Sequence, residues 1–298
     1  MGRLNIFIVA FVFISCSGKQ SHQNIDELQH AIEQRLSDLE GNFAVAYQNI
    51  SDTEQNIMIN TNERFHAAST MKTPVLIELY KRAALKEFDI MDSIVIKNEF
   101  KSIVDGSTFT MEVTVDSEKD LYENLNKKTS FYHLAYEMIT RSSNLATNIL
   151  IDFLDAKNIT ATMRELGADS IEVLRGVEDL KAYRQGLSNS TTAHDLFVIF
   201  EQLSSDTLVN KYANKEMLKI LKDQKYNDMI SAKLPEGTEV AHKTGWITNV
   251  HHDSGIVYTS EDEGYILIFL SKNAPDREAV LNASADISRM IYDYQTAK

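Results

Sequence analysis

Segments with strand-like and helix-like periodicity follow one another along this chain in an order that restricts the possible folds. Two strand-like segments lie near the start, at 43–47 and 57–59, and three lie near the end, at 238–244, 251–259 and 264–271. The segments between them have helical periodicity instead. This order predicts an α+β fold with α/β/α layers, in which both chain ends build one five-stranded antiparallel sheet and an all-helical subdomain is inserted between its halves.

Apolar residues at helical spacing indicate where the helices lie. The expected helices are 25–40, 70–86, 129–141, 144–155, 160–166, 191–204, 214–223 and 276–295. The segment 70–86 is apolar on nearly every side, so we expect it to be buried. Pro74 is tolerated only in the first turn of a helix, which puts the start of this helix close to Ser69. Residues 168–190 have no strong period and are predicted to form a long loop.

The N-terminal residues have the pattern of an export signal. Arg3 is followed by the apolar run 6–14, which is too short to span a bilayer, and then by Ser15 and Cys16. Cys16 is the only cysteine, and its position resembles the lipobox of bacterial lipoproteins, in which the cysteine receives lipid and becomes the new N-terminus. This predicts a signal peptide over 1–15, a tether over 16–24 and one folded domain over 25–298. The alternative is a plain signal peptide with an incidental cysteine.

The charge of the chain restricts its partners. The formal net charge is −13, whereas a nucleic-acid surface needs clustered lysine and arginine. We therefore expect no nucleic-acid partner.

Three short motifs carry the chemistry of the chain. They are Ser69-Thr70-Met71-Lys72 (S-x-x-K), Ser142-Ser143-Asn144 (S-x-N) and Lys243-Thr244-Gly245 (K-T-G). Each is weak alone, since S-x-x-K is expected about once by chance in such a chain and S-x-N occurs again at 271–273. Their context is more specific, because the first opens a buried helix, the second joins two helices and the third ends a strand.

The spacing of the first motif suits a nucleophile and its base. A serine hydroxyl needs a nearby base to take its proton, and residues i and i+3 share one face of a helix. Lys72 can therefore reach Ser69, and burial would lower its pKa so that the neutral amine acts as the base. The alternative is that Ser69 only caps a helix and Lys72 is a solvated side chain.

In this order the motifs resemble the active-site elements of class A β-lactamases and penicillin-binding proteins, and the resemblance covers most of residues 40–295. It implies a monomeric serine hydrolase with no cofactor and no metal, which opens a β-lactam through an acyl-enzyme on Ser69. Ser142 would carry a proton to the leaving nitrogen, and Lys243 and Thr244 would bind a substrate carboxylate. A backbone N–H near Ser69 would supply one half of an oxyanion hole. The backbone N–H of Trp246, just beyond Gly245, would supply the other half. The alternatives are a helix cap for Ser142 and an exposed strand position for Lys243.

The resemblance extends to the residues that would serve deacylation, with two departures. Asn148 lies four residues after Asn144, the spacing at which class A enzymes have an asparagine that orients the catalytic carboxylate. Aligned from Arg175 without a gap, Val177 falls on that carboxylate's position, and a shift of one residue restores Glu178. We choose Glu178 and keep Asp179 as the next candidate, the alternative being a solvated acidic pair.

The second departure is Ser143, which stands where the family's S-D-N motif has aspartate. There we expect altered packing with retained chemistry.

The run His251-His252-Asp253 could suggest a metal site, but adjacent strand residues point to opposite faces. We expect one of these histidines to lie in the pocket beside Lys243 and the other to pack, and His66 to be a packing or supporting residue.

The residues thus favour a periplasmic, lipid-anchored serine β-lactamase of the bacterial envelope. Two alternatives are a penicillin-binding or DD-peptidase-like protein acting on peptidoglycan peptides and a catalytically silent binding lipoprotein.

Overall fold

The computed structural model describes residues 24–261 and 263–297. Cys16, the predicted lipidation site, and the predicted signal peptide over 1–15 lie outside the described residues, as does most of the predicted tether. Within the described part of the chain, no helix combines the length and the apolar character needed to cross a membrane.

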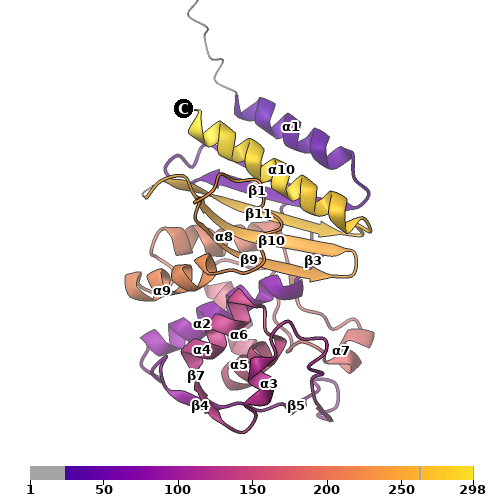
Figure 1. Ribbon diagram of the computed structural model, residues 1–298, viewed down its shortest axis with the longest axis vertical. Helices are drawn as coiled ribbons and strands as arrows, with labels where there is room; N and C mark the ends of the chain where they lie inside the picture. The colour runs from indigo at the N-terminus through magenta and orange to yellow at the C-terminus, as the bar shows by residue number, and fades with distance from the viewer. Residues whose placement is uncertain (1–23, 262, 298) are drawn as a thin grey trace, which may run out of the picture.

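A five-stranded antiparallel sheet forms the centre of the fold, as the sequence predicts (Figure 1). Its strands are β1 (Asn42–Asn49), β2 (Asn56–Ile59), β9 (Val240–Ile247), β10 (Val250–Tyr258) and β11 (Gly264–Lys272), in the order β2-β1-β11-β10-β9. The first strand pairs with the last one, with Ala46 opposite Ile268. The sheet therefore joins the two ends of the chain.

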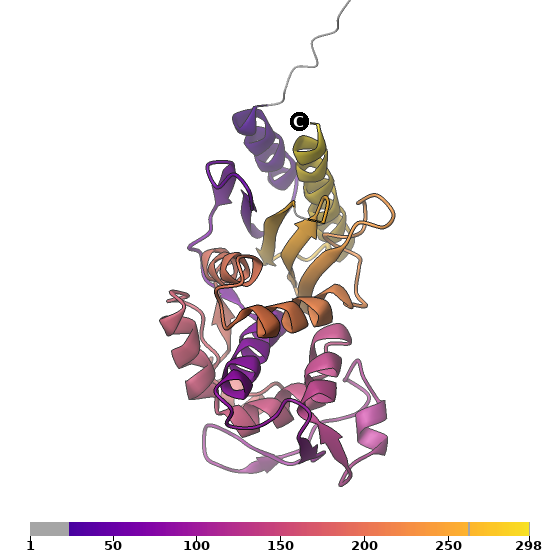
Figure 2. The same cartoon turned by 90° about the vertical axis from the view of Figure 1, so that its left-hand side faces the viewer.

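Helices cover both faces of the sheet (Figure 2). Helices α1 (Ile25–Ser37) and α10 (Arg277–Thr296) pack side by side on one face, and α8 (Ala193–Ser204) and α9 (Lys211–Lys222) lie against the other. Strand β1 alternates between the two cores: Ala44 and Ala46 belong to the core beneath α8, while Val45 and Tyr47 pack with α1 and α10.

The inserted subdomain is mainly helical, and not all-helical as the sequence predicts, because it also contains short ribbons. Its helices are α2 (Lys72–Ala84), α3 (Asp120–Glu123), α4 (Phe131–Thr140), α5 (Asn144–Leu154), α6 (Ala156–Glu165) and α7 (Leu180–Arg184). Three small ribbons accompany them: β3 (Phe65–His66) with β8 (Ser190–Thr191), β4 (Ser93–Val95) with β7 (Lys128–Ser130), and β5 (Phe100–Lys101) with β6 (Thr108–Phe109). Helix α2 runs through the core, and its residues 72–80 are all buried.

The structure differs from the sequence prediction at several boundaries. The helix expected over 70–86 begins as a 3-10 turn, η1 (Ala68–Met71), and the α-helix itself runs from Lys72 to Ala84. Helix α6 begins before the expected residue 160, because the Asp155 side chain caps it at Lys157 N. The segment 168–190 contains α7, which Asp179 caps.

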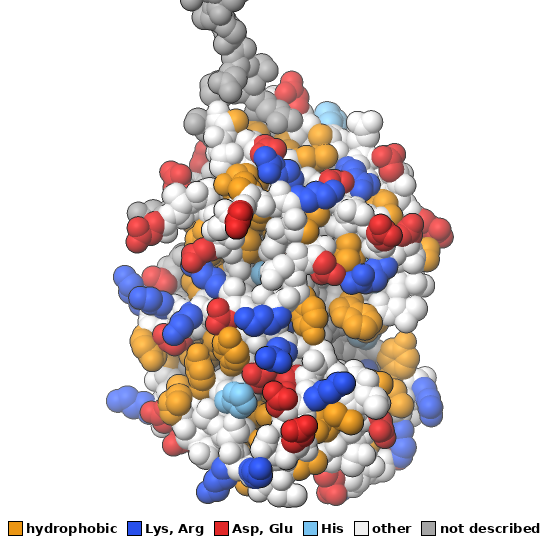
Figure 3. Space-filling model, in the orientation of Figure 1, with side chains coloured by type: hydrophobic (Ala, Val, Ile, Leu, Met, Phe, Trp, Pro, Cys, Tyr) orange, Lys and Arg blue, Asp and Glu red, His pale blue; other side chains and the backbone are white. Residues whose placement is uncertain are grey.

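Charge is spread evenly over the face in Figure 3, where acidic and basic side chains are interspersed.

Candidate active site

Ser69 lies where the sheet meets the helical subdomain. It is half-buried in η1, directly before α2, and the strand β9 passes against its backbone. A Cβ added to Gly245 would lie 2.9 Å from Ser69 N and 3.0 Å from Thr70 N. Only glycine permits so close an approach, which explains the glycine of K-T-G. Trp246 follows it in β9 with its side chain exposed.

Lys72 is fully buried and contacts the turn that leads from α4 into α5. Its Nζ donates to Ser142 O at 2.7 Å, to Ser142 Oγ at 3.1 Å and to Asn144 Oδ1 at 2.9 Å. Burial lowers the pKa of Lys72 to about 7, although the carboxylates of Asp116 and Glu178 oppose this shift. Near neutral pH a large part of this amine is therefore unprotonated and able to accept a proton.

Lys243 approaches the same hydroxyl from β9. Its Nζ donates to Ser142 Oγ at 3.2 Å and to Thr244 O at 2.7 Å. Burial, together with the charge of Lys72, holds the pKa of Lys243 well below its usual range. Because two lysines donate to the Ser142 hydroxyl oxygen, the proton of that hydroxyl is directed toward another acceptor. Ser142 itself has a φ of +57° in the turn between α4 and α5.

Asn144 and Asn148 connect α5 to the loop that contains Glu178. Asn144 Nδ2 donates to Glu178 Oε1 at 3.3 Å. Asn148 binds the backbone of Val177 twice, accepting from its N–H at 2.7 Å and donating to its carbonyl at 3.0 Å. Burial raises the pKa of the half-buried Glu178 carboxyl, and the hydrogen bond from Asn144 opposes this. The structure thus brings Glu178 to the group formed by Lys72 and Asn144.

Asp179, the other candidate carboxylate, is engaged elsewhere. Its oxygens accept from Ser102 Oγ at 2.9 Å, from Ile103 N at 2.9 Å and from Ala182 N at 3.1 Å. Burial would raise the pKa of Asp179, but hydrogen bonds led by Ala182 and Ile103 give a net lowering. Asp179 therefore holds the loop and α7 in place, on the side occupied by the β5–β6 ribbon.

Comparisons with known proteins identify the family to which the chain belongs. The model of the "Beta-lactamase enzyme family" matches residues 27–295. The chain belongs to this family. No curated protein sequence matches the chain significantly.

Solved structures extend this family assignment to the fold. A β-lactamase from Sphaerobacter thermophilus is 22% identical, with a TM-score of 0.77 over 92% of this chain and 99% of its own. The TLA-3 extended-spectrum β-lactamase is 21% identical, with a TM-score of 0.81 over 91% and 99%. A variant of PBP-A, solved as an acyl-enzyme complex with penicillin G, is 22% identical, with a TM-score of 0.77 over 92% and 97%. The chain therefore has the fold shared by β-lactamases and penicillin-binding proteins.

In this member of the beta-lactamase family His252, which follows K-T-G, supports the serine-bearing segment. His252 is fully buried; its Nε2 lies 2.9 Å from His66 O and its Nδ1 accepts from Ser271 N at 3.2 Å. Burial lowers the pKa of His252 to about 4, so the ring is neutral. His252 therefore joins β11 to β3, in the packing role that the sequence predicts for one of the two histidines. His66, as expected, has a supporting role, since its Nδ1 accepts from Ala68 N at 3.0 Å.

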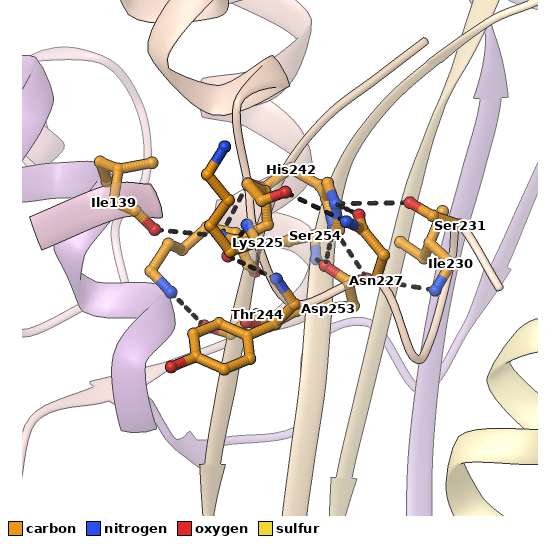
Figure 4. A network of polar contacts seen from close by, with 12 residues as sticks. Ile139, Lys225, Asn227, Ile230, Ser231, His242, Thr244, Asp253 and Ser254 are labelled. Carbon is orange, nitrogen blue, oxygen red and sulfur yellow. Dashed lines mark hydrogen bonds and ion pairs between the residues drawn. The ribbon is translucent and has the colours of Figure 1, made fainter. Parts of the chain in front are cut away.

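A buried polar network behind β9 was missed by the sequence analysis (Figure 4). His242 Nδ1 lies 2.9 Å from Asp253 Oδ1, and His242 Nε2 lies 3.0 Å from Asn227 Oδ1. Asp253 Oδ2 also accepts from Ile230 N at 3.1 Å. The His251-His252-Asp253 run was the only sign of this network in the sequence. Its aspartate, Asp253, contacts His242 on the neighbouring strand. Among the described residues, no group of three His, Cys, Asp or Glu side chains could hold a metal ion.

Proposed function

We propose that this chain is a serine β-lactamase of the class A type, with Ser69 as the nucleophile. The observation that carries the proposal is the convergence of two buried lysines, Lys72 and Lys243, on the hydroxyl of Ser142 beside the turn that contains Ser69. Burying a lysine side chain costs free energy. Two buried lysines at one site therefore indicate a chemical role.

Acylation begins when unprotonated Lys72 takes the proton of Ser69 and the serine oxygen attacks the lactam carbonyl. The developing oxyanion is met by the backbone N–H groups of Ser69 and Trp246. The lactam C–N bond then breaks, and Ser142 gives its proton to the leaving nitrogen. Lys72, protonated in the first step, returns a proton to Ser142 along their hydrogen bond. Each proton lost is thereby replaced.

Substrate orientation is assigned to the K-T-G segment. Lys243 and the hydroxyl of Thr244 would bind the carboxylate that β-lactams and peptidoglycan peptides share. The close approach of Gly245 to Ser69 keeps this binding segment and the nucleophile at a fixed separation.

Deacylation is assigned to Glu178. Its carboxylate would take a proton from a water that attacks the ester carbonyl, and Asn144 and Asn148 hold the carboxylate and its loop. The raised pKa of Glu178 brings it closer to the working pH, which makes it a better base than an ordinary surface glutamate.

Two substitutions test the proposal by intact-mass measurement with a penicillin and a chromogenic cephalosporin. Ser69→Ala should abolish both turnover and covalent labelling. Glu178→Gln should still acylate and then accumulate as the acyl-enzyme, with turnover slowed on the order of 10²- to 10⁴-fold. Asp179→Asn is the matched control, because it neutralises the adjacent carboxylate. Labelled mass in Ser69→Ala, or stalling of Asp179→Asn alone, would refute the assigned residues.

A penicillin-binding or DD-peptidase-like activity is the second candidate, and one observation favours it. Asn148 binds the peptide of Val177, the residue that an ungapped alignment puts at the catalytic glutamate, while Glu178 has a φ of +63°. If the wild-type protein itself accumulates as acyl-enzyme, and Glu178→Gln does so equally, this second activity replaces the first.

We also propose that Cys16 carries lipid and holds the protein to the bacterial envelope membrane, on the periplasmic side. The support is the position of this single cysteine after the apolar run 6–14. Cys16→Ser should release the protein from membranes in its host, and equal membrane retention of the variant would contradict the proposal.

A further inference from the structure

A buried carboxylate outside the three motifs contacts the centre of the site. Asp116, on the segment between β6 and α3, is 6% exposed. Its Oδ1 accepts from Asn144 N at 2.9 Å, and its Oδ2 accepts from Leu145 N at 2.8 Å and from the Tyr122 hydroxyl at 2.9 Å. A side chain 28 residues upstream thus binds the first two N–H groups of α5.

These bonds complete the start of α5. The first backbone N–H groups of a helix have no partner within it, and a negative charge at that end is favourable. Ser143 already caps the helix through Ala146 N at 3.2 Å. Asp116 accepts from the two N–H groups before Ala146, those of Asn144 and Leu145, and its carboxylate also places a negative charge at this helix end.

The neighbouring residue holds the same turn from its other side. Ser117 Oγ donates to Arg141 O at 2.6 Å and to Ser142 O at 3.2 Å. Ser142 O also accepts from Lys72. Residues 116 and 117 together therefore fix the turn 141–145, which contributes both Ser142 and Asn144 to the site.

Asn144 contacts both proposed bases, Lys72 and Glu178, so its position affects both. Its Oδ1 accepts from Lys72 and its Nδ2 donates to Glu178. A displacement of its backbone would move both contacts at once.

Asp116 also acts through its charge. Its carboxylate is the largest of the influences that oppose the lowering of the Lys72 pKa, and it contributes to the raised pKa of Glu178. The other charged groups facing Lys72 are Glu178 from the 174–179 loop and Lys243 from β9.

On its own side, Asp116 faces Tyr122 of α3, and it accepts from Glu118 N at 3.3 Å. Asp116 therefore links the segment that leads into α3 to the start of α5.

We propose that Asp116 is a positioning residue for acylation, which holds Asn144 and Ser142 in place and acts on Lys72 through its negative charge. The inference rests on the proposed function, because it assigns Lys72 as the base. It predicts that the charge of Asp116, and not only its shape, matters for the reaction.

Asp116→Asn tests this prediction, since it keeps the size of the side chain and removes the charge. Titration of Lys72, followed by the NMR signal of its ¹³Cε carbon and assigned with Lys72→Arg, should show a midpoint lower by about half to one pH unit. The acidic limb of the penicillin-labelling rate should move the same way. Glu118→Gln is the matched control: its side chain is equally buried on the same segment but caps Leu121 and makes no bond to α5.

The two readouts separate the inference from the function. If the wild-type protein takes no penicillin, the proposed function fails, while the lysine titration still tests Asp116. An Asp116→Asn midpoint equal to that of wild type and Glu118→Gln overturns the inference. If Asp116→Asn does not fold, Asp116→Glu takes its place. That variant keeps the charge, so the midpoint should stay while labelling slows, and an unchanged labelling rate would overturn the positioning role.

Discussion

The candidate site has two walls that are held in place in different ways. We call the residues on or beside the sheet, Ser69, Lys243 and Gly245, the sheet wall, and those of the inserted subdomain, Ser142, Asn144 and Glu178, the helical wall. Backbone fixes the sheet wall: β9 is paired along its length with β10, and Gly245 lies against the amide of Ser69.

Side chains fix the helical wall. Ser142 and Glu178 both have left-handed φ values, and their segments are held by single side chains such as Asp116 and Asn148. A strained backbone of this kind persists only where its surroundings impose it. From this difference we expect changes in the sheet wall to slow acylation strongly, whereas changes in the helical wall should alter one step and spare another.

The largest expected effect is that of Gly245→Ala in the sheet wall. The new Cβ would meet the backbone nitrogens of Ser69 and Thr70, which cannot move without shifting η1. We expect acylation to slow on the order of 10²- to 10³-fold, the effect of losing an oxyanion donor. Stopped-flow labelling with a penicillin measures it. If Gly245→Ala is acylated at the wild-type rate, the backbones of β9 and η1 can move apart without loss of acylation.

Asn148→Ala should affect the helical wall selectively. The variant loses both hydrogen bonds to Val177, so the loop with Glu178 is no longer fixed. Deacylation should slow by up to about 10²-fold, the scale expected for a misplaced catalytic group, with much smaller loss of acylation.

Gly176→Ala provides a second route to the same result, because its Cβ would crowd Asn148 Oδ1. The lifetime of the acyl-enzyme in each variant measures the effect. If acylation and deacylation slow by the same factor in these variants, the proposed distinction between the two walls is wrong.

The pH dependence of acylation tests which residue supplies the base. With burial lowering the Lys72 pKa to about 7, the unprotonated amine increases as pH rises through that value. The labelling rate should therefore fall about tenfold for each pH unit below this midpoint and level off above it. If the labelling rate falls only well below pH 7, the base for acylation is instead a carboxylate, that of Glu178.

The smallest expected effect is that of Ser143→Ala, which removes the side-chain cap of α5 at Ala146 N. The free energy of unfolding should fall by about 1 kcal/mol, as for an ordinary N-cap. Asn210→Ala removes the equivalent cap of α9 at Ala213 N, far from the site, and should cost a similar amount. Denaturant unfolding measures both. Because Asp116 still binds α5, labelling should persist in Ser143→Ala, and its loss would make the cap part of the site.

Periodicity was sufficient to predict the sheet, its antiparallel order from both chain ends and the major helices, because these elements bury regular apolar faces. It gave nothing for the region between α2 and α4. The strands there are two or three residues long, and residues such as Val113 and Val115 are exposed, so no period develops.

For the site, the three motifs identified residues that the fold does bring together. The supporting residues could not be found this way. Asp116 meets Asn144, and Asp253 meets His242, only once separate segments have packed, and neither pair has a characteristic local spacing.

The pairing of β1 with β11 has a consequence for how the chain folds. In the finished sheet β1 is an inner strand, yet its partner β11 comes from almost the other end of the sequence, with Asn42 opposite Lys272. Such distant pairing gives a high contact order, which slows folding because a long loop must close first. Until the last strands have been synthesised, β1 and β2 form only a two-stranded hairpin with unpaired edges, a structure of marginal stability. An incomplete chain therefore lacks both the five-stranded sheet and the strand β9 that lies against Ser69.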